Sequence, residues 1–150
     1  MYTDTITLFC RHEDKKKDVM WYPYVLHGVN LNMDAAAIVA KYGAESQDSV
    51  ALNIRYTAEN GLKMIGGKQW LPPKEWHRQT ENIAETLTFT SGQEFDFFYA
   101  GEWPDESPVS DSEYGIDGFY DYMNAKYDYV YAITSVAQYS VIPHFEIMAK

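Results

Sequence analysis

The most β-prone stretch of the chain is its last segment, residues 127–150, with the sequence YDYVYAITSVAQYSVIPHFEIMAK. Tyr, Val and Ile dominate this segment, and such side chains suit a pleated, half-buried surface. The pattern predicts two strands, Tyr127–Ala137 and Ile142–Ala149, joined by a turn around Tyr139-Ser140. Because an isolated hairpin is only marginally stable, earlier segments are expected to supply strands that pair with it.

Two earlier segments alternate between apolar and polar residues with the period of a strand. In Thr3–His12 the inward residues are Ile6, Leu8 and Cys10, and the segment ends in a solvated turn at Glu13–Asp18. In Ser49–Thr57 the inward residues are Val50, Leu52, Ile54 and Tyr56. Both segments therefore predict strands with one buried face.

Further strands are predicted with less regular patterns. Val19–Leu31 reads as a strand in which Pro23 indicates an edge or a bulge and Gly28 a second irregularity. Met33–Tyr42 allows two interpretations, because its Ala run has helix propensity while Ile38-Val39 favours a strand, and the strand is preferred. The other predicted strands are Leu62–Ile65 before Gly66-Gly67, and a hairpin of Thr86–Thr90 with Glu94–Ala100 across Ser91-Gly92-Gln93. Leu87 and Phe89 are expected to pack opposite Phe95, Phe97 and Tyr99 in that hairpin.

One short helix is predicted near residues 113–126. Its apolar residues recur at helical spacing and comprise Ile116, Phe119, Tyr120, Met123 and Tyr127. Ser110 and Glu113 have the spacing of a capping box at its start. With 150 residues the chain predicts a single domain over 1–150. The expected fold is mainly β, a small barrel or sandwich of about seven or eight strands with long loops.

Charge divides the chain into two unequal halves. Residues 1–78 hold ten basic and nine acidic side chains, whereas residues 79–150 hold two basic and thirteen acidic ones. A surface that grips a nucleic-acid backbone is cationic, so tight nucleic-acid binding is disfavoured. The sequence also carries no charged-then-apolar leader and no apolar run of membrane-spanning length, which favours folding in a cytoplasm without membrane contact.

Motifs for catalysis, metal binding or phosphate binding are absent from the sequence. The four histidines lack zinc spacing, and Cys10 reads as a buried structural thiol. Acidic residues gather in one segment, where a solvated surface is the expected role: Asp105, Glu106, Asp111, Glu113, Asp117 and Asp121. We therefore expect no enzyme activity, no catalytic residues, no metal and no cofactor.

Residues 69–78, QWLPPKEWHR, differ in texture from the strands. Pro72-Pro73 imposes an extended kink that Trp70 and Trp76 flank. Two readings stay open, a recognition surface and a plug over the mouth of a barrel, and the plug is favoured because large aromatic side chains bury much apolar area.

Several segments together resemble a family of structural proteins. They are TITLFCRHED followed by WYPYVLHGVNL, then DSVALNIRY and LPPKEW, and finally the run 127–150. This series resembles small structural proteins of long-tailed phages and prophages, of the minor-capsid and head–tail connector kind. The likeness covers residues 3–31, 49–78 and 127–150, and residues 79–126 are interpreted as a candidate family-variable insertion.

The resemblance implies a non-catalytic β-barrel that assembles as a homo-oligomeric ring, as a head-closure (stopper) or connector subunit of the virion neck. Its implied partners are the portal, adaptor and tail proteins, with DNA passing nearby without specific binding. The implied location is the host bacterial cytoplasm before assembly and the virion neck afterwards. A tail-terminator or minor tail protein is the alternative of the same class, and a carbohydrate- or peptide-binding domain that uses exposed tryptophans is the alternative of another class.

Candidate residues follow from these expectations. The candidate subunit contacts are Trp70, Pro72, Pro73, Trp76, Trp103, Tyr114, Phe119 and Tyr120. The acidic residues named above, from Asp105 to Asp121, are candidates for an acidic lumen or surface, because such a surface would let DNA slide past without holding it.

Overall fold

The computed structural model describes residues 2–33 and 50–150, and this part of the chain is mainly β, as predicted. Its strands are β1 (Asp4–Glu13), β2 (Val19–Asn32), β3 (Val50–Arg55), β4 (Thr57–Glu59), β5 (Leu62–Ile65), β6 (Lys68–Trp70), β7 (Thr86–Leu87), β8 (Phe97–Tyr99), β9 (Val109–Ser110), β10 (Val130–Tyr139) and β11 (His144–Ala149). Its helices are α2 (Pro73–His77) and α3 (Gly118–Lys126), with 3-10 turns η1 (Ile83–Glu85) and η2 (Asp111–Tyr114). The strands predicted at Thr3–His12, 19–31 and 49–57 are present, whereas the one predicted at 33–42 lies outside the described residues except for Met33, which is not in a strand.

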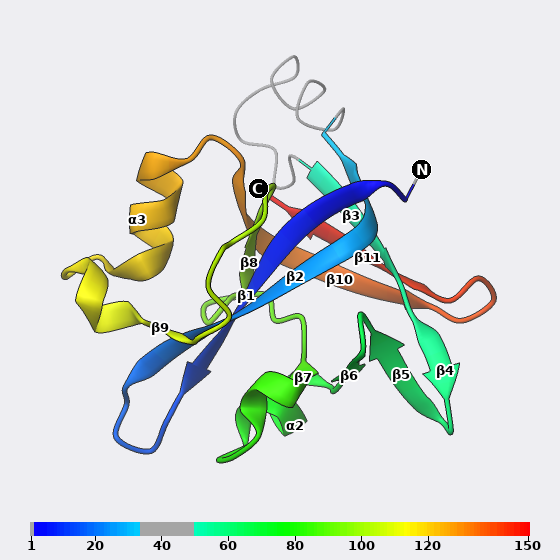
Figure 1. The fold of residues 1–150 in the computed structure, drawn as a ribbon, viewed down its shortest axis with the longest axis horizontal. Helices are drawn as coiled ribbons and strands as arrows, with labels where there is room; N and C mark the ends of the chain where they lie inside the picture. The colour runs from blue at the N-terminus through cyan, green and yellow to red at the C-terminus, as the bar shows by residue number, and fades with distance from the viewer. Residues whose placement is uncertain (1, 34–49) are drawn as a thin grey trace.

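Six strands close into a barrel. The larger sheet has the order β1-β8-β10-β11-β3-β2-β9, and β1 also pairs with β2, so the first six strands of that order form a ring (Figure 1). Neighbouring strands in this ring are antiparallel. Closure removes the unpaired edges that an open sheet exposes to other chains.

Strand alternation fills the inside of the barrel. In β1 the side chains of Ile6, Leu8 and Cys10 point into the barrel and are buried. In β3 the side chains of Val50, Leu52 and Ile54 also point inward and are buried. Both predicted alternations are confirmed. The inner core also contains Phe98 of β8 and Ile133 of β10. We call this cluster the inner core.

A second, smaller sheet and helix α2 close one end of the barrel. The small sheet has the order β4-β5-β6-β7, and β5 and β6 form a hairpin whose turn residues Gly66 and Gly67 have positive φ angles of 56° and 82°. Pro73 occupies the first turn of α2, where its missing N–H costs nothing. Trp76 follows and is 0% exposed within the inner core. The predicted plug is therefore confirmed for Trp76, while the proline pair starts a helix as well as bending the chain.

A second core lies on the outside of the barrel wall and is covered by α3. Phe9, Phe97 and Val130 point outward from β1, β8 and β10, and together with Trp21 they contact Phe119 and Met123 of α3. We call this cluster the outer core. The helix that the apolar spacing predicts is thus present at residues 118–126.

Two details of the helix prediction are wrong. Ile116 was expected on the buried face, but its side chain is 101% exposed, because residues 111–114 form a separate 3-10 turn and the helix begins only at Gly118. The side chain of Ser110 makes no capping hydrogen bond. Instead the Asp111 carboxylate accepts a hydrogen bond from the N–H of Phe119 at 2.9 Å, which satisfies a donor at the start of α3.

The predicted hairpin of residues 86–100 is also wrong. Strand β7 pairs in parallel with β6 in the small sheet, whereas β8 pairs with β1 and β10 in the barrel wall. The connection between them is held by Asp96, whose N–H donates to the Thr90 carbonyl at 2.8 Å. The segment 79–126 therefore supplies a barrel strand, and its proposed variability within a family stays a prediction.

Both predicted irregularities of β2 are confirmed. Pro23 pairs with Phe9 of β1, and it lies between the parts of β2 that pair with β9 (residues 20–21) and with β3 (residues 30–32), so no partner on that side needs its missing N–H. Gly28 has φ +68° at a bulge where the register against β1 shifts.

Candidate functional site

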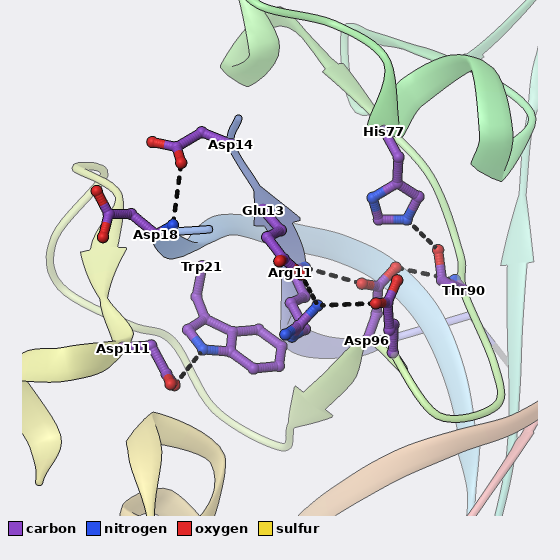
Figure 2. A network of polar contacts seen from close by, with 10 residues as sticks. Arg11, Glu13, Asp14, Asp18, Trp21, His77, Thr90, Asp96 and Asp111 are labelled. Atoms are coloured by element: carbon purple, nitrogen blue, oxygen red, sulfur yellow. Dashed lines mark hydrogen bonds and ion pairs between the residues drawn. The ribbon is translucent and has the colours of Figure 1, made fainter. Parts of the chain in front are cut away.

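A buried carboxylate anchors the loop before β8 to strand β1 (Figure 2). Asp96 is 0% exposed, and its two oxygens accept hydrogen bonds from the N–H groups of Arg11 and Thr90, each at 2.8 Å. Burial raises the pKa of Asp96 to about 8, although the two N–H donors act in the opposite direction by favouring the charged form. The group is therefore a structural link between two distant segments, and it lies beneath the surface rather than in an open site.

Cys10 lies next to this carboxyl group and is equally buried. Its thiol donates to the Thr88 carbonyl at 3.2 Å, and burial raises its pKa well above the usual value. Because the reactive form of a cysteine is the thiolate, this thiol is inert, which agrees with the structural role expected from the sequence.

An open cleft lies above this network, between the β1–β2 turn and the residues that follow α2. Its volume is about 850 Å³, and its walls include His12, Tyr22, His77 and Arg78. The Nε2 of His12 donates to the Gln79 carbonyl at 2.9 Å, and the Nε2 of His77 is hydrogen-bonded to the Thr90 hydroxyl at 3.0 Å. Burial lowers the pKa of His77, so its ring favours the neutral form.

The β1–β2 turn that borders the cleft is structured by its own carboxylate. Asp14 accepts hydrogen bonds from the N–H groups of Lys16 and Asp18 at 2.8 and 2.9 Å, and Lys17 has a positive φ of 67°. This is the solvated turn predicted from the sequence. The cleft thus mixes both signs of charge, and each of its two histidines makes a hydrogen bond within the fold.

Two of the predicted contact residues are core residues. Trp76 and Phe119 are both 0% exposed, so they are unavailable to a neighbouring subunit and their prediction as contacts is wrong. The physical reason is that Trp76 closes the barrel end and Phe119 covers its outer wall. The remaining candidates keep some surface: Trp70, Pro73, Trp103, Tyr114 and Tyr120 are half-buried, and Pro72 is exposed.

The predicted acidic surface is present with one exception. Asp111 is half-buried and accepts hydrogen bonds from Trp21 Nε1 at 2.8 Å and from the Phe119 N–H, so it is a structural carboxylate. The others are exposed in two regions: Asp105 and Glu106 in a loop near β2, and Glu113, Asp117 and Asp121 in the 3-10 turn, the link and the helix of the α3 region. The structure thus separates this set into two places instead of one.

Sequence reasoning missed a group of exposed apolar side chains in the described chain, at the turn between β10 and β11. We call residues 139–143 the hairpin tip; Val141 is 97% exposed, Ile142 70% and Tyr139 46%. The hairpin extends away from the barrel on the side opposite to α3 (Figure 1). The second strand was predicted to begin at Ile142, but β11 begins only at His144, so Val141, Ile142 and Pro143 belong to the turn. Three consecutive apolar residues beside the turn predicted at Tyr139-Ser140 were a usable signal of an exposed apolar site.

A second exposed apolar residue, Ile116, lies at the other end of the molecule. It belongs to residues 115–118, which we call the glycine link, because Gly115 and Gly118 bound it and both have φ +87°. Glu113 and Asp117 are exposed beside it. The apolar hairpin tip thus lies on one side of the barrel. The glycine link, with one exposed apolar residue beside exposed acidic ones, lies on the other side (Figure 1).

Neither a metal cluster nor a membrane helix is found in the described ranges. Residues 2–33 and 50–150 contain no group of three His, Cys, Asp or Glu side chains placed to hold a metal ion. No helix in the same ranges is long and apolar enough to cross a bilayer.

The antiparallel barrel is closed, Trp76 fills one end of its interior, and α3 packs against its outer wall. The chain is thus a mainly β protein whose available surfaces are its projecting loops. The chain belongs to the family described as "Family of unknown function (DUF6751)", whose model matches residues 1–150. No curated protein and no solved structure matches it. That description assigns no function, so we infer one from the geometry and from the sequence resemblance.

Proposed function

We propose that the protein is a non-catalytic structural subunit that assembles as a ring in the neck of a phage or prophage virion, as a head-closure or connector protein. The observation that carries this proposal is the hairpin tip, where Val141 and Ile142 are 97% and 70% exposed at the end of a hairpin that projects from the barrel (Figure 1). Exposed apolar side chains grouped on a projecting element are typical of protein–protein contact sites. The resemblance of the strand segments to neck proteins supplies the kind of assembly.

The polar network supports a role without catalysis. Asp96 and Cys10 are fully buried and hydrogen-bonded to the backbone. His12 and His77 border the cleft, but each ring holds a partner within the fold. All four groups thus take part in hydrogen bonds that hold segments of the chain together.

Charge supports the placement beside DNA. The exposed acidic residues of the second half, including Glu113, Asp117 and Asp121, would repel a phosphate backbone. A ring that presents such residues toward a channel lets DNA pass without holding it. In this proposal the protein folds in the host bacterial cytoplasm and becomes part of the virion neck on assembly.

The alternative of the same class is a tail-terminator or minor tail protein, and the same exposed tip would serve it. The carbohydrate- or peptide-binding alternative is weaker. It required a surface of tryptophans, but Trp76 is fully buried, and Trp70 and Trp103 are half-buried with their Nε1 atoms enclosed. A binding platform of stacked aromatic faces is therefore not formed by these three side chains.

The decisive experiment incubates the purified full-length protein with portal–adaptor complexes and, separately, with tail tubes of the same phage or prophage. Negative-stain microscopy then shows where density is added. An extra ring at the adaptor exit is the expected result and gives the symmetry. Rings on the tail tubes alone would move the protein to the alternative role, and binding to neither structure would overturn the proposal.

A further inference from the structure

We propose that the hairpin tip of one copy docks on the glycine link of the next copy, so that the chain associates head to tail. The inference rests on the proposed function, because it identifies the contact between neighbouring subunits of the ring. The occupant of each surface is thus a second copy of this chain, with Val141 and Ile142 on one side and Ile116 on the other.

The positions of the two surfaces determine the symmetry of such a contact. The β10–β11 hairpin extends on one side of the barrel, and α3 with the preceding turn lies on the other side (Figure 1). A contact between two different surfaces is heterologous, and repeated heterologous contacts produce a closed ring or a filament. A symmetric dimer would instead bring two tips together and would end at two copies.

The hairpin tip is held in place by the rest of the fold. Tyr56 fixes it twice, because its hydroxyl donates to the Tyr139 carbonyl at 3.1 Å and its N–H to the Pro143 carbonyl at 3.3 Å. The rings of Tyr139 and His144 stack at 4.7 Å across the turn. A preorganised surface loses little conformational entropy on binding, which favours its use as a contact.

The glycine link is also held. Its end is tied to the preceding 3-10 turn by Asp111, which accepts the Phe119 N–H at 2.9 Å and the Trp21 Nε1–H at 2.8 Å. Phe119 itself is enclosed in the outer core. Ile116 is therefore presented to solvent at full exposure by a segment anchored on both the helix and the barrel wall.

The segments near the two surfaces include side chains of opposite charge. Glu113 and Asp117 are exposed beside Ile116. Near the base of the hairpin, Arg55 lies opposite His144 in the β3–β11 register, with its guanidinium over the ring of Tyr2. Lys63 lies over the ring of Trp70, which in turn packs on Phe145. Opposite charges around a small apolar centre guide orientation and suppress contacts between two identical ends.

The apolar centre of this contact is small. Three strongly exposed side chains fall short of the about 800 Å² that each partner contributes to a standard stable interface. We therefore expect weak association in free solution and strong association when a symmetric template holds neighbouring copies together, because tethering raises their effective concentration.

The test introduces cysteines at both surfaces, as Val141→Cys and Ile116→Cys in one chain. Both positions are exposed, and the native Cys10 is buried, so the fold is expected to persist. A disulfide forms only when two Cα atoms approach within about 7 Å. Oxidation of the double variant, at high concentration and on portal–adaptor complexes, should give a ladder of linked multimers, whereas either single variant should give dimers at most.

The matched control combines Val141→Cys with Lys15→Cys, an exposed position in the β1–β2 turn. No excess of multimers over this control, in either setting, would overturn the docking proposal. Added ring density at the adaptor exit without the ladder of multimers would support the neck function and contradict only the proposed contact. A ladder of multimers without binding to portal or tail structures would support the proposed contact and contradict the neck function.

A charge variant gives an independent readout. Val141→Asp places a carboxylate against Glu113 and Asp117 of the next copy, so self-association measured by sedimentation velocity should weaken roughly thirtyfold, the effect of removing a central apolar anchor. Thr80→Asp, at an exposed position away from both surfaces, is the control that should leave association unchanged. Equal behaviour of the two variants would contradict the assignment of the tip.

Discussion

The barrel wall has a core on each side, and the two cores are built differently. Strands β1 and β8 contribute to both: Leu8 and Phe98 point inward, whereas Phe9 and Phe97 point outward. The inner core is enclosed by a closed ring of strands and by Trp76 at one end. The outer core is covered mainly by one short helix, α3, with neighbouring loop residues such as Trp103 packed against it.

This difference has a consequence for stability. A residue inside the ring can be exposed only by opening paired strands, which amounts to global unfolding. A residue under α3 can be exposed when that helix and its preceding turn detach, and such local openings cost less free energy than global ones. Mutations in the two cores should therefore differ in kind as well as in size.

The largest effect is expected in the inner core. Trp76→Ala should lower the free energy of unfolding by about 3–5 kcal/mol, because it leaves a large cavity at the barrel end. Urea denaturation measures the loss, and Lys74→Ala on the exposed side of α2 should change it by less than about 0.5 kcal/mol. A loss below about 1 kcal/mol for the Trp76 variant would show that it does not plug the barrel.

The outer core should respond locally. Phe119→Ala should cost about 3 kcal/mol, and hydrogen exchange should accelerate at the amides of 118–126 while those of β10 and β11 stay protected. Asn124→Ala, exposed on the same helix, is the control. Equal acceleration throughout the barrel would erase the proposed distinction between the two cores.

A smaller loss is expected at the carboxylate that attaches the start of α3. Asp111→Ala removes the acceptor for Trp21 Nε1 and the Phe119 N–H, so we expect a loss of about 2 kcal/mol. Glu113→Ala and Asp117→Ala remove exposed charges and should each change stability by less than about 0.5 kcal/mol. Thermal unfolding of the three variants side by side checks the ranking, and indistinguishable values would contradict the structural role of Asp111.

Asp96 predicts a dependence of stability on pH. Its pKa is raised to about 8 in the folded chain, above the ordinary 3.8 that applies on unfolding, so the folded state binds more protons between these values. Stability should therefore fall as the pH rises from about 4 toward 8, by at most about 1.4 kcal/mol per pH unit for one proton. Asp96→Asn cannot titrate, and its unfolding free energy should lack this component; parallel curves for the two proteins would contradict it.

The smallest effect on stability is expected at Ile116, three positions before the buried Phe119. Ile116→Ser should change the free energy of unfolding by less than about 0.5 kcal/mol, because the side chain is already fully exposed. Measured by the same denaturation as Phe119→Ala, it contrasts a solvent-facing apolar residue with a buried one three positions away. A large loss would show that Ile116 packs in the outer core.

Prediction from sequence worked where a local pattern and the tertiary environment agree. The alternations of 3–12 and 49–57 identify inward residues correctly, because a strand with one buried face has a fixed period of two. The hairpin predicted for residues 86–100 is wrong, because its two strands, β7 and β8, belong to different sheets. Thr90 and Asp96 are nevertheless close in space, since the Asp96 N–H donates to the Thr90 carbonyl. No local pattern shows that the carboxylate of Asp96 will bind the backbone of Arg11.

The candidate surfaces divide in the same way. Apolar content alone made Trp76 and Phe119 attractive as contacts, and only burial in the folded chain removes them. Exposure in the folded chain also overturns the prediction for Ile116, whose helical spacing predicts a buried side chain but which is fully exposed. Exposure depends on what packs from elsewhere in the chain, so it cannot be read from the residue type.

By itself the sequence determined that the chain is mainly β, that its second half is acidic, and that the segment from residue 127 onward contains a hairpin. These properties depend on composition and on periods of a few residues. Tertiary structure alone decided that six strands close into a ring, that Trp76 fills its end, and that Val141 and Ile142 stay in solvent. Those outcomes depend on pairings such as β1 with β8, between segments more than eighty residues apart, and local residue patterns carry no information about which distant segments will meet.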